Sequence, residues 1–155
     1  MRLVASASGG TALKIGGPMG AWGVDTFDND TACDWAASLE DYEDLSLVTS
    51  ALQAAIDESE DYLDADVASA ALAACEVIAR LHGRFGARNS YTESVDEWVR
   101  SHPLVPDDSI VALALEAIDV VLGKHSELRE LWEEGDGNAA AWKQSVESLR
   151  KRVSG

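Results

Sequence analysis

Four aspartates near the start of the chain lie close enough in sequence to bind a cation or to act together in catalysis. They are Asp25, Asp28, Asp30 and Asp34. Clustered carboxylates bind hard cations, and the D-x-N/D spacing is typical of calcium loops. The glycine of the sixth loop position is missing, however, and Ala36 stands where such a loop has its glutamate. Asn29 or Asp30 can instead cap a following helix, which requires no ion. An ion site or an enzymatic site at this cluster is therefore kept as one alternative hypothesis.

Other patterns that carry chemistry are absent or incomplete. The stretches GGPMGAWG and GKHS match neither the dinucleotide nor the P-loop pattern, and no GxSxG elbow occurs. His82, His102 and His125 lie near expected helix ends, which favours capping over metal ligation. Cys33 and Cys75 belong to no CxxC pair and lie among apolar residues, which favours small buried side chains over reactive thiols. We therefore expect no catalytic residue, no cofactor and no resident metal.

Most of the chain after these aspartates has the apolar spacing of α-helices. After Asp30, apolar residues recur at spacings of three and four, and β-branched alternation is missing. The pattern predicts helices over about 31–41, 45–58, 64–82, 90–101, 110–122, 126–134 and 138–153. The expected fold is all-α, a single compact bundle of six or seven helices with an irregular N-terminal segment.

Several local details follow from the same pattern. Ser90 and Glu93 are spaced as a capping box for the fourth helix, and Gly83 suits the position after the third. Between Ile110 and Leu122 only Glu116 and Asp119 are polar, so we expect that helix to be central and packed on most sides.

The aromatic residues around the aspartates have a structural interpretation. Gly20 and Gly23 allow the chain to bend around Trp22, and Trp22 and Phe27 could each bury a large apolar area against the bundle. Trp35 lies on the apolar face expected for the first helix. The candidate motif, functional or structural, consists of Trp22, Asp25, Phe27, Asp28, Asn29, Asp30, Asp34 and Trp35.

Charge is distributed unevenly along the chain. The net charge is −16, and the 65 residues between Lys14 and Arg80 contain fifteen acids and no Lys, Arg or His. Binding to phosphate needs clustered Lys and Arg, so the sequence disfavours a nucleic-acid partner and an anionic membrane surface. The same field would attract a basic protein partner.

The chain has no sign of membrane insertion or export. No run of 18 apolar residues occurs, and the opening MRLVASASGGTALKIGGP makes a poor signal peptide. We expect a cytoplasmic protein. Residues 1–18 are rich in Gly, Ser and Ala, and we expect them to be a flexible or non-native extension ahead of a single helical domain over 19–155.

Three segments resemble one known family. The opening MGAWG-x-x-x-FDND-x-A-x-DW, here Met19 to Trp35, is similar to the start of a family of uncharacterised bacterial proteins. YLDADVASAALAACEVIARLHG and SELRELWEEGDGNAAAWKQSVESLR resemble its alanine-rich middle helix and its tryptophan-containing tail. Asp25 departs from the pattern, which has a small residue there. The resemblance implies a start at Met19 and a helical fold, and the family is a domain of unknown function, so it implies no reaction.

Three functions are compatible with these observations. The first is a non-enzymatic protein-binding module, immunity-like or antitoxin-like, that binds a basic partner through the acidic half of the chain. The second is an ion-dependent protein or an enzyme that uses the aspartates of residues 25–34. The third is a helical scaffold that self-associates through alanine-rich or tryptophan-bearing faces.

Overall fold

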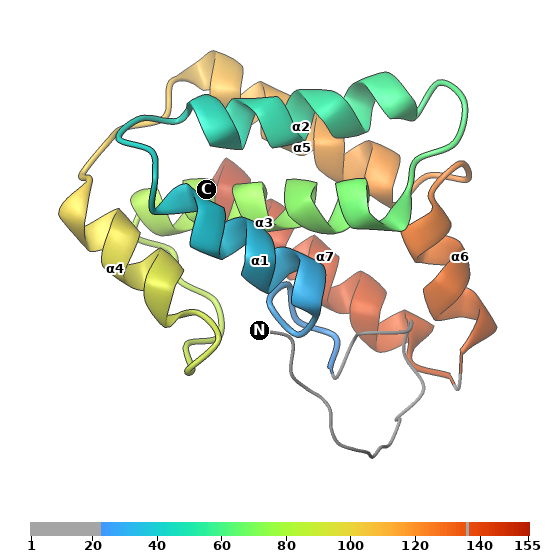
Figure 1. Ribbon diagram of the computed structural model, residues 1–155. Coiled ribbons are helices and arrows are strands. Elements are labelled where there is room, and N and C mark those ends of the chain that lie inside the picture. Colours follow the sequence, from blue (N-terminus) through green and yellow to red (C-terminus); the bar gives the residue numbers. More distant parts are fainter. Residues whose placement is uncertain (1–22, 136) are drawn as a thin grey trace.

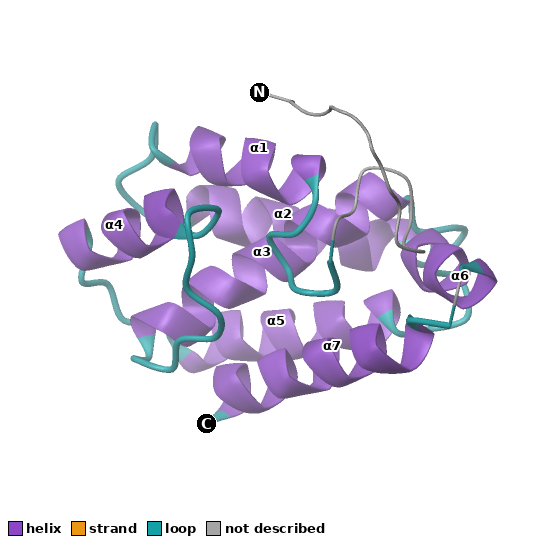
Figure 2. Ribbon diagram, turned by 90° about the horizontal axis from the view of Figure 1, so that it is seen from below, coloured by secondary structure: helices purple, strands orange, loops and turns teal. Residues whose placement is uncertain are grey.

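The computed structural model describes residues 23–135 and 137–155, and this part of the chain forms helices and no β-strand. The helices are α1 (Asp30–Leu39), α2 (Ser46–Glu58), α3 (Ala65–Leu81), α4 (Glu93–Ser101), α5 (Asp108–Val121), α6 (Glu127–Glu134) and α7 (Ala139–Ser154). The predicted all-α bundle is confirmed (Figure 1), and Figure 2 shows the described part of the chain as helices joined by loops. Residues 1–18, predicted to be an extension, and Trp22, predicted to fill the core, lie outside the described residues.

Short polar side chains begin four of the helices by accepting a hydrogen bond from a free backbone N–H of the first turn. These N-caps are Asn29 for α1, Asp64 for α3, Asp107 for α5 and Ser126 for α6. The prediction that Asn29 or Asp30 caps the first helix is confirmed for Asn29. Gly83 follows the end of α3 with φ of 82°, as predicted, because a glycine adopts the left-handed conformation without strain.

The predicted capping box at the start of α4 is wrong. The helix begins at Glu93, three residues later than expected, and Thr92 precedes it without a capping hydrogen bond from its side chain. The Thr92 hydroxyl is used elsewhere, because it accepts from Asn89 N–H at 3.0 Å and donates to Asp96 Oδ2 at 2.9 Å. Residues 89–92 therefore form a turn, and Ser90 lies in that turn instead of at a helix start.

The central element is α3, which contacts each of the other six helices and runs through the middle of the molecule in Figure 1. Its residues 71–80 are all buried. Many of them are alanines, which let neighbouring helices approach closely. The prediction of a central helix over 110–122 is wrong. Only Ala114, Ala117, Ile118 and Val121 of α5 are buried, because α5 packs on α2, α3 and α7 and leaves its remaining face to solvent.

The three histidines lie at helix ends, as predicted. His82 and His102 end α3 and α4, and His125 precedes α6. The His102 ring stacks on Trp98 at 4.4 Å between centroids, and its Nε2 lies 3.1 Å from Glu43 Oε1. The Trp98 indole N–H also donates to Tyr42 O at 2.9 Å. These contacts attach the loop between α1 and α2 to α4.

No helix within residues 23–135 and 137–155 is both long enough and apolar enough to cross a membrane.

Candidate binding site

The segment before α1 folds back on itself in a tight turn. Asp28 N–H donates to Asp25 O at 3.0 Å, Asp25 N–H donates to Asp28 Oδ2 at 3.1 Å, and Asn29 Nδ2 donates to Thr26 O at 3.2 Å. Gly23 is needed beside this turn, because a Cβ there would lie 2.2 Å from Asp28 Oδ2. Phe27 is 3% exposed and belongs to the core, so the prediction that it packs against the bundle is confirmed.

A buried ion network holds this segment on α3. The Arg80 side chain is 1% exposed, and its guanidinium pairs with Glu76 and, at 2.7 Å, with Asp96 Oδ1. It also donates to Ala87 O at 2.7 Å. Arg152 of α7 donates to both oxygens of Glu76 at 3.0 Å. A buried charge is tolerated only when it is paired and hydrogen-bonded, so these contacts fix where α3, α4 and α7 meet.

The N-terminal segment is attached to the same network at two points. The Thr26 hydroxyl donates to Glu76 Oε2 at 2.9 Å. The Phe27 ring lies 5.9 Å from the Arg80 guanidinium carbon, and the Phe85 ring lies 5.4 Å from it on a separate loop. Aromatic faces attract a cation at this range. The position of residues 23–29 therefore depends on Arg80 and Glu76.

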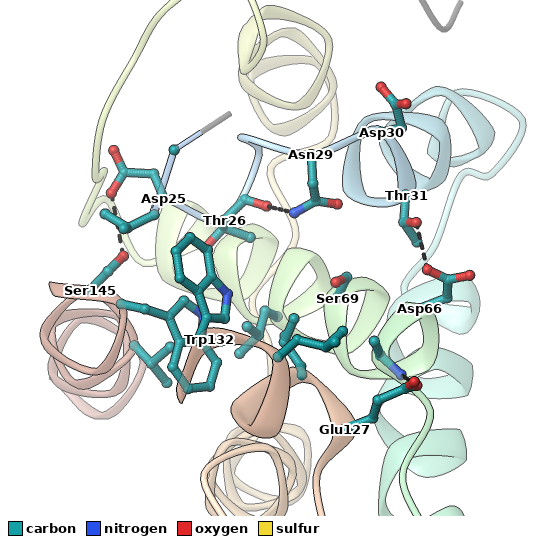
Figure 3. Close-up of a pocket in the computed structure, with 18 of the residues that line it drawn as sticks. Asp25, Thr26, Asn29, Asp30, Thr31, Asp66, Ser69, Glu127, Trp132 and Ser145 are labelled. Carbon is teal, nitrogen blue, oxygen red and sulfur yellow. Dashed lines mark hydrogen bonds between the residues drawn. The ribbon is translucent and has the colours of Figure 1, made fainter. Parts of the chain in front are cut away.

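A pocket of about 410 Å³ opens beside the N-terminal segment (Figure 3). Four parts of the chain enclose it: residues 23–31, the start of α3, α6, and the first turns of α7. Its apolar lining consists of Val24, Ala65, Leu72, Leu128, Leu131, Trp132, Trp142 and Val146. Its polar lining includes the acids Asp25, Asp30, Asp64, Asp66 and Glu127, and no Lys or Arg of the described residues lines it.

The carboxylates at the pocket have neutral hydrogen-bond donors as partners. Asp25 Oδ1 accepts from the Ser145 hydroxyl at 3.3 Å, and Asp66 Oδ1 accepts from the Thr31 hydroxyl at 2.9 Å. Glu127 Oε1 accepts from Ala65 N–H at 2.9 Å, and Asp64 caps α3. Asp30 has no hydrogen-bond or ion-pair partner in the described part of the chain. No salt bridge there joins any of the five acids to a base. Asp30, Asp64, Asp66 and Glu127 lie instead at helix N-termini, where the helix dipole favours negative charge.

Residues 20–145 match the model of a protein family described as a domain of unknown function (DUF4259). The chain belongs to this family. The expected membership in a family of uncharacterised proteins is thereby confirmed, and the matched region of this DUF4259 chain includes the N-terminal segment, α3, α6 and the first turns of α7. No curated protein and no solved structure shows significant similarity to it.

The structure separates the four aspartates that the sequence places together. Asp25 and Asp30 line the large pocket, whereas Asp28 and Asp25 line a smaller cavity of about 20 Å³ beside Glu76 and Arg80. Asp34 is exposed on α1 and lines neither. Within the described ranges, no three His, Cys, Asp or Glu side chains are grouped so that they could hold a metal ion. The turn at 25–28 and the start of α1 point these carboxylates in different directions.

The other residues of the predicted motif, like the two cysteines, cap a helix or pack in or against the core. Asn29 caps α1 and also lines the pocket. Trp35 is half-buried against the core, and its indole N–H is buried without a hydrogen-bond partner in the part of the chain that the structure describes. Cys33 donates to Phe27 O at 3.3 Å, and burial, followed by the charges of Asp30, Asp34 and Asp28, raises the pKa of its thiol to about 11. Burial likewise raises the pKa of Cys75, which is fully buried as predicted.

Sequence reasoning did not find the ion network or most of the pocket. Glu76 and Arg80 were detectable, because two charges in the middle of an otherwise apolar, alanine-rich helix need buried partners. Their partners Asp96 and Arg152 lie 16 and 76 residues away from Arg80 and Glu76, respectively, and no local pattern joins them.

Replacement of Arg80 by methionine should lower the free energy of unfolding by about 3–5 kcal/mol, because Glu76 and Asp96 lose the buried cation that joins them. Glu76 would keep Arg152, and Asp96 would keep only the exposed Arg88 at 3.7 Å. Urea denaturation followed by circular dichroism measures this loss. Arg100→Met is the control, since the Arg100 side chain is 61% exposed and pairs with exposed Glu97. That variant should lose about 0.5 kcal/mol or less. Equal losses in the two variants would contradict the assigned role of Arg80.

Replacement of Asp28 by asparagine should preserve or raise the melting temperature at pH 7. Burial raises the pKa of Asp28 above its usual 3.8, and the Asp25 charge adds to this against the opposing hydrogen bond from Asp25 N–H. The folded state therefore binds the proton more tightly, and ionised Asp28 costs stability above this pKa. The advantage of the variant should shrink as the pH falls towards 3.8. A large loss of stability at pH 7, with Asp34→Asn unchanged, would show that the Asp28 charge is needed.

Proposed function

We propose that the protein is a non-enzymatic binding module that captures a basic segment of a partner protein at one end of its helical bundle. The observation that carries this proposal is the pocket with five carboxylates in its lining, none of them paired with a Lys or Arg within the described residues. Neutralisation of a partner, as by an immunity protein or an antitoxin, is one form that such binding takes.

The pocket belongs to a larger acidic surface, which we call the acidic end and define as residues 57–66 and 127–134. Leu63 joins the two segments, because its N–H donates to His125 O and its carbonyl accepts from Glu127 N–H, both at 2.9 Å. The first segment has six acids and no base, and the second has four acids and one base, so the acidic end carries −9. The α2–α3 loop and α6 lie side by side at one end of the molecule in Figure 1.

Two sets of contacts involve the acids of this surface. The Tyr62 hydroxyl donates to Glu130 Oε1 at 2.6 Å, and this bond, with burial and the charges of Glu130, Glu127 and Glu134, raises the pKa of Tyr62 to about 12. The nearby bases Arg129 and Lys143 both pair with Glu133, whose pKa they lower. Within residues 23–135 and 137–155, the other nine acids of the acidic end form no salt bridge.

Several bases of the C-terminal half pair with acids away from this end. Arg80 and Arg152 pair with Glu76, and Arg150 pairs with Asp119 and Glu147. The α4 and α7 side of the bundle is thus nearer to electrical balance than the acidic end. A fold with one strongly negative end favours fast, salt-sensitive association with a basic surface. It also opposes self-association through that end, because two such ends repel each other.

A labelled peptide of mixed arginine, lysine and leucine tests the proposal by fluorescence anisotropy with the full chain. The chain should bind the peptide at low ionic strength and bind it more weakly as salt screens the charges. The triple variant Asp57→Asn, Glu60→Gln, Asp61→Asn removes three exposed charges of the acidic end and should weaken binding several-fold.

The matched control removes three exposed charges elsewhere, in the variant Asp34→Asn, Glu40→Gln, Asp41→Asn. These residues lie on α1 and on the loop that contacts α4, away from α6. The control variant should bind the peptide like the unmodified chain. Equal weakening in both triple variants, or no binding at low ionic strength, would count against the proposal.

A further inference from the structure

We propose that the 410 Å³ pocket is the specific subsite for one arginine side chain of the basic partner. This inference rests on the proposed function and adds to it the residue that the pocket recognises. Three features carry it: an apolar wall that includes two tryptophans, carboxylates fixed in place by neutral donors, and a serine hydroxyl that opens into the pocket and has no hydrogen-bond partner among the described residues.

The aromatic wall is formed by Trp132 of α6 and Trp142 of α7. Their rings are stacked with centroids 6.2 Å apart and planes 11° apart, and both line the pocket. Figure 3 shows Trp132 beside the pocket, with Asp25 and Ser145 on one side and Ser69 and Asp66 on the other. Trp132 and Trp142 are only 4% and 3% exposed, so the parts of them that reach the pocket serve as an apolar wall. The aliphatic stem of an arginine packs on this wall and on neighbouring apolar lining such as Leu131.

The carboxylates are held in position without being neutralised. Ser145, Thr31 and the backbone N–H of Ala65 each orient one carboxylate, on Asp25, Asp66 and Glu127 respectively. These three acids come from the N-terminal segment, α3 and α6, so negative charge surrounds the pocket from several sides. Charge oriented in advance favours a ligand that brings a cation and many N–H donors.

Ser69 supplies an observation independent of the acids. It is 6% exposed, lines the pocket from α3, and its hydroxyl has no hydrogen-bond partner in the described part of the chain. The residue is buried but its hydroxyl opens into the pocket, where the oxygen has lone pairs that accept from an N–H group of a ligand. A guanidinium presents five N–H donors in a plane, whereas an ammonium presents three from one point. The acceptors at this pocket lie on different elements, and therefore they suit arginine better than lysine.

Three short peptides of the same flanking sequence, each with leucines around the central residue and lysines at the ends, test this specificity. The first peptide has arginine as its central residue. The second has lysine, which keeps the charge, and the third has citrulline, which keeps the shape of arginine without its charge. Isothermal titration calorimetry with the full chain should give the tightest binding for the arginine peptide, about tenfold tighter than for the citrulline peptide.

The variants separate the pocket from the surface around it. Asp25→Asn with Asp66→Asn removes two charges and keeps an acceptor for Ser145 and Thr31, so it should abolish the arginine preference without unfolding the chain. Ser69→Ala should reduce the preference for arginine over lysine. The control, Asp44→Asn with Asp107→Asn, removes two exposed acids that accept from Ser46 and Ser109 outside the pocket, and it should keep the full preference.

Equal binding of the arginine and lysine peptides, unchanged in the pocket variants but weakened in the acidic-end triple variant, would overturn the arginine subsite and leave the proposed function standing. If no peptide binds, both proposals fail. A dimer in sedimentation equilibrium that dissociates in the Asp25→Asn, Asp66→Asn variant would assign the pocket to a second copy of the chain and overturn the subsite as well.

Discussion

The buried guanidinium of Arg80 determines which segments of the chain come together at one end of α3. It lies on the helix that contacts all six others, and it is balanced by Glu76 of the same helix and Asp96 of α4. Glu76 in turn holds Arg152 of α7 and Thr26 of the N-terminal segment. Because a buried charge without partners is strongly destabilising, these groups have to come together, and three remote parts of the chain are thereby placed around one end of α3.

The candidate site is a consequence of this arrangement. With Thr26 and Phe27 fixed on α3, the turn at 25–28 carries Asp25 to the edge of the pocket, and α1 begins at Asp30 beside it. The opposite side is built by α6 and α7, whose tryptophans stack on each other. The bases of the network are already engaged by Glu76 and Asp96, so they do not neutralise the carboxylates around the pocket. Glu76, Asp96, Arg80 and Arg152 of the ion network therefore balance one another, whereas the acids that line the pocket have no Lys or Arg partner among the described residues.

Local features of the sequence were sufficient for the helices and insufficient for the site. Spacing of apolar residues and short polar caps such as Asn29 and Asp64 act within a few residues, so the all-α class and most helix boundaries could be predicted. The identity of the central helix could not be predicted in this way. The apolar content of Ile110–Leu122 does not decide how many helices pack around it, whereas the small alanines of α3 let several helices approach. The pocket combines four distant segments, and the aspartates of residues 25–34, although adjacent in sequence, point to different surroundings.

Binding of a basic side chain in the pocket between the N-terminal segment, α3, α6 and α7 can be observed residue by residue. The experiment is heteronuclear NMR of the ¹⁵N-labelled full chain titrated with the arginine peptide. The largest shifts are expected in the backbone signals of residues 23–31, 64–72, 127–132 and 142–146 and in the indole N–H signals of Trp132 and Trp142, with little change in α4. Shifts confined to the loop at residues 40–45 and α4, or spread evenly over all exposed acids, would contradict it.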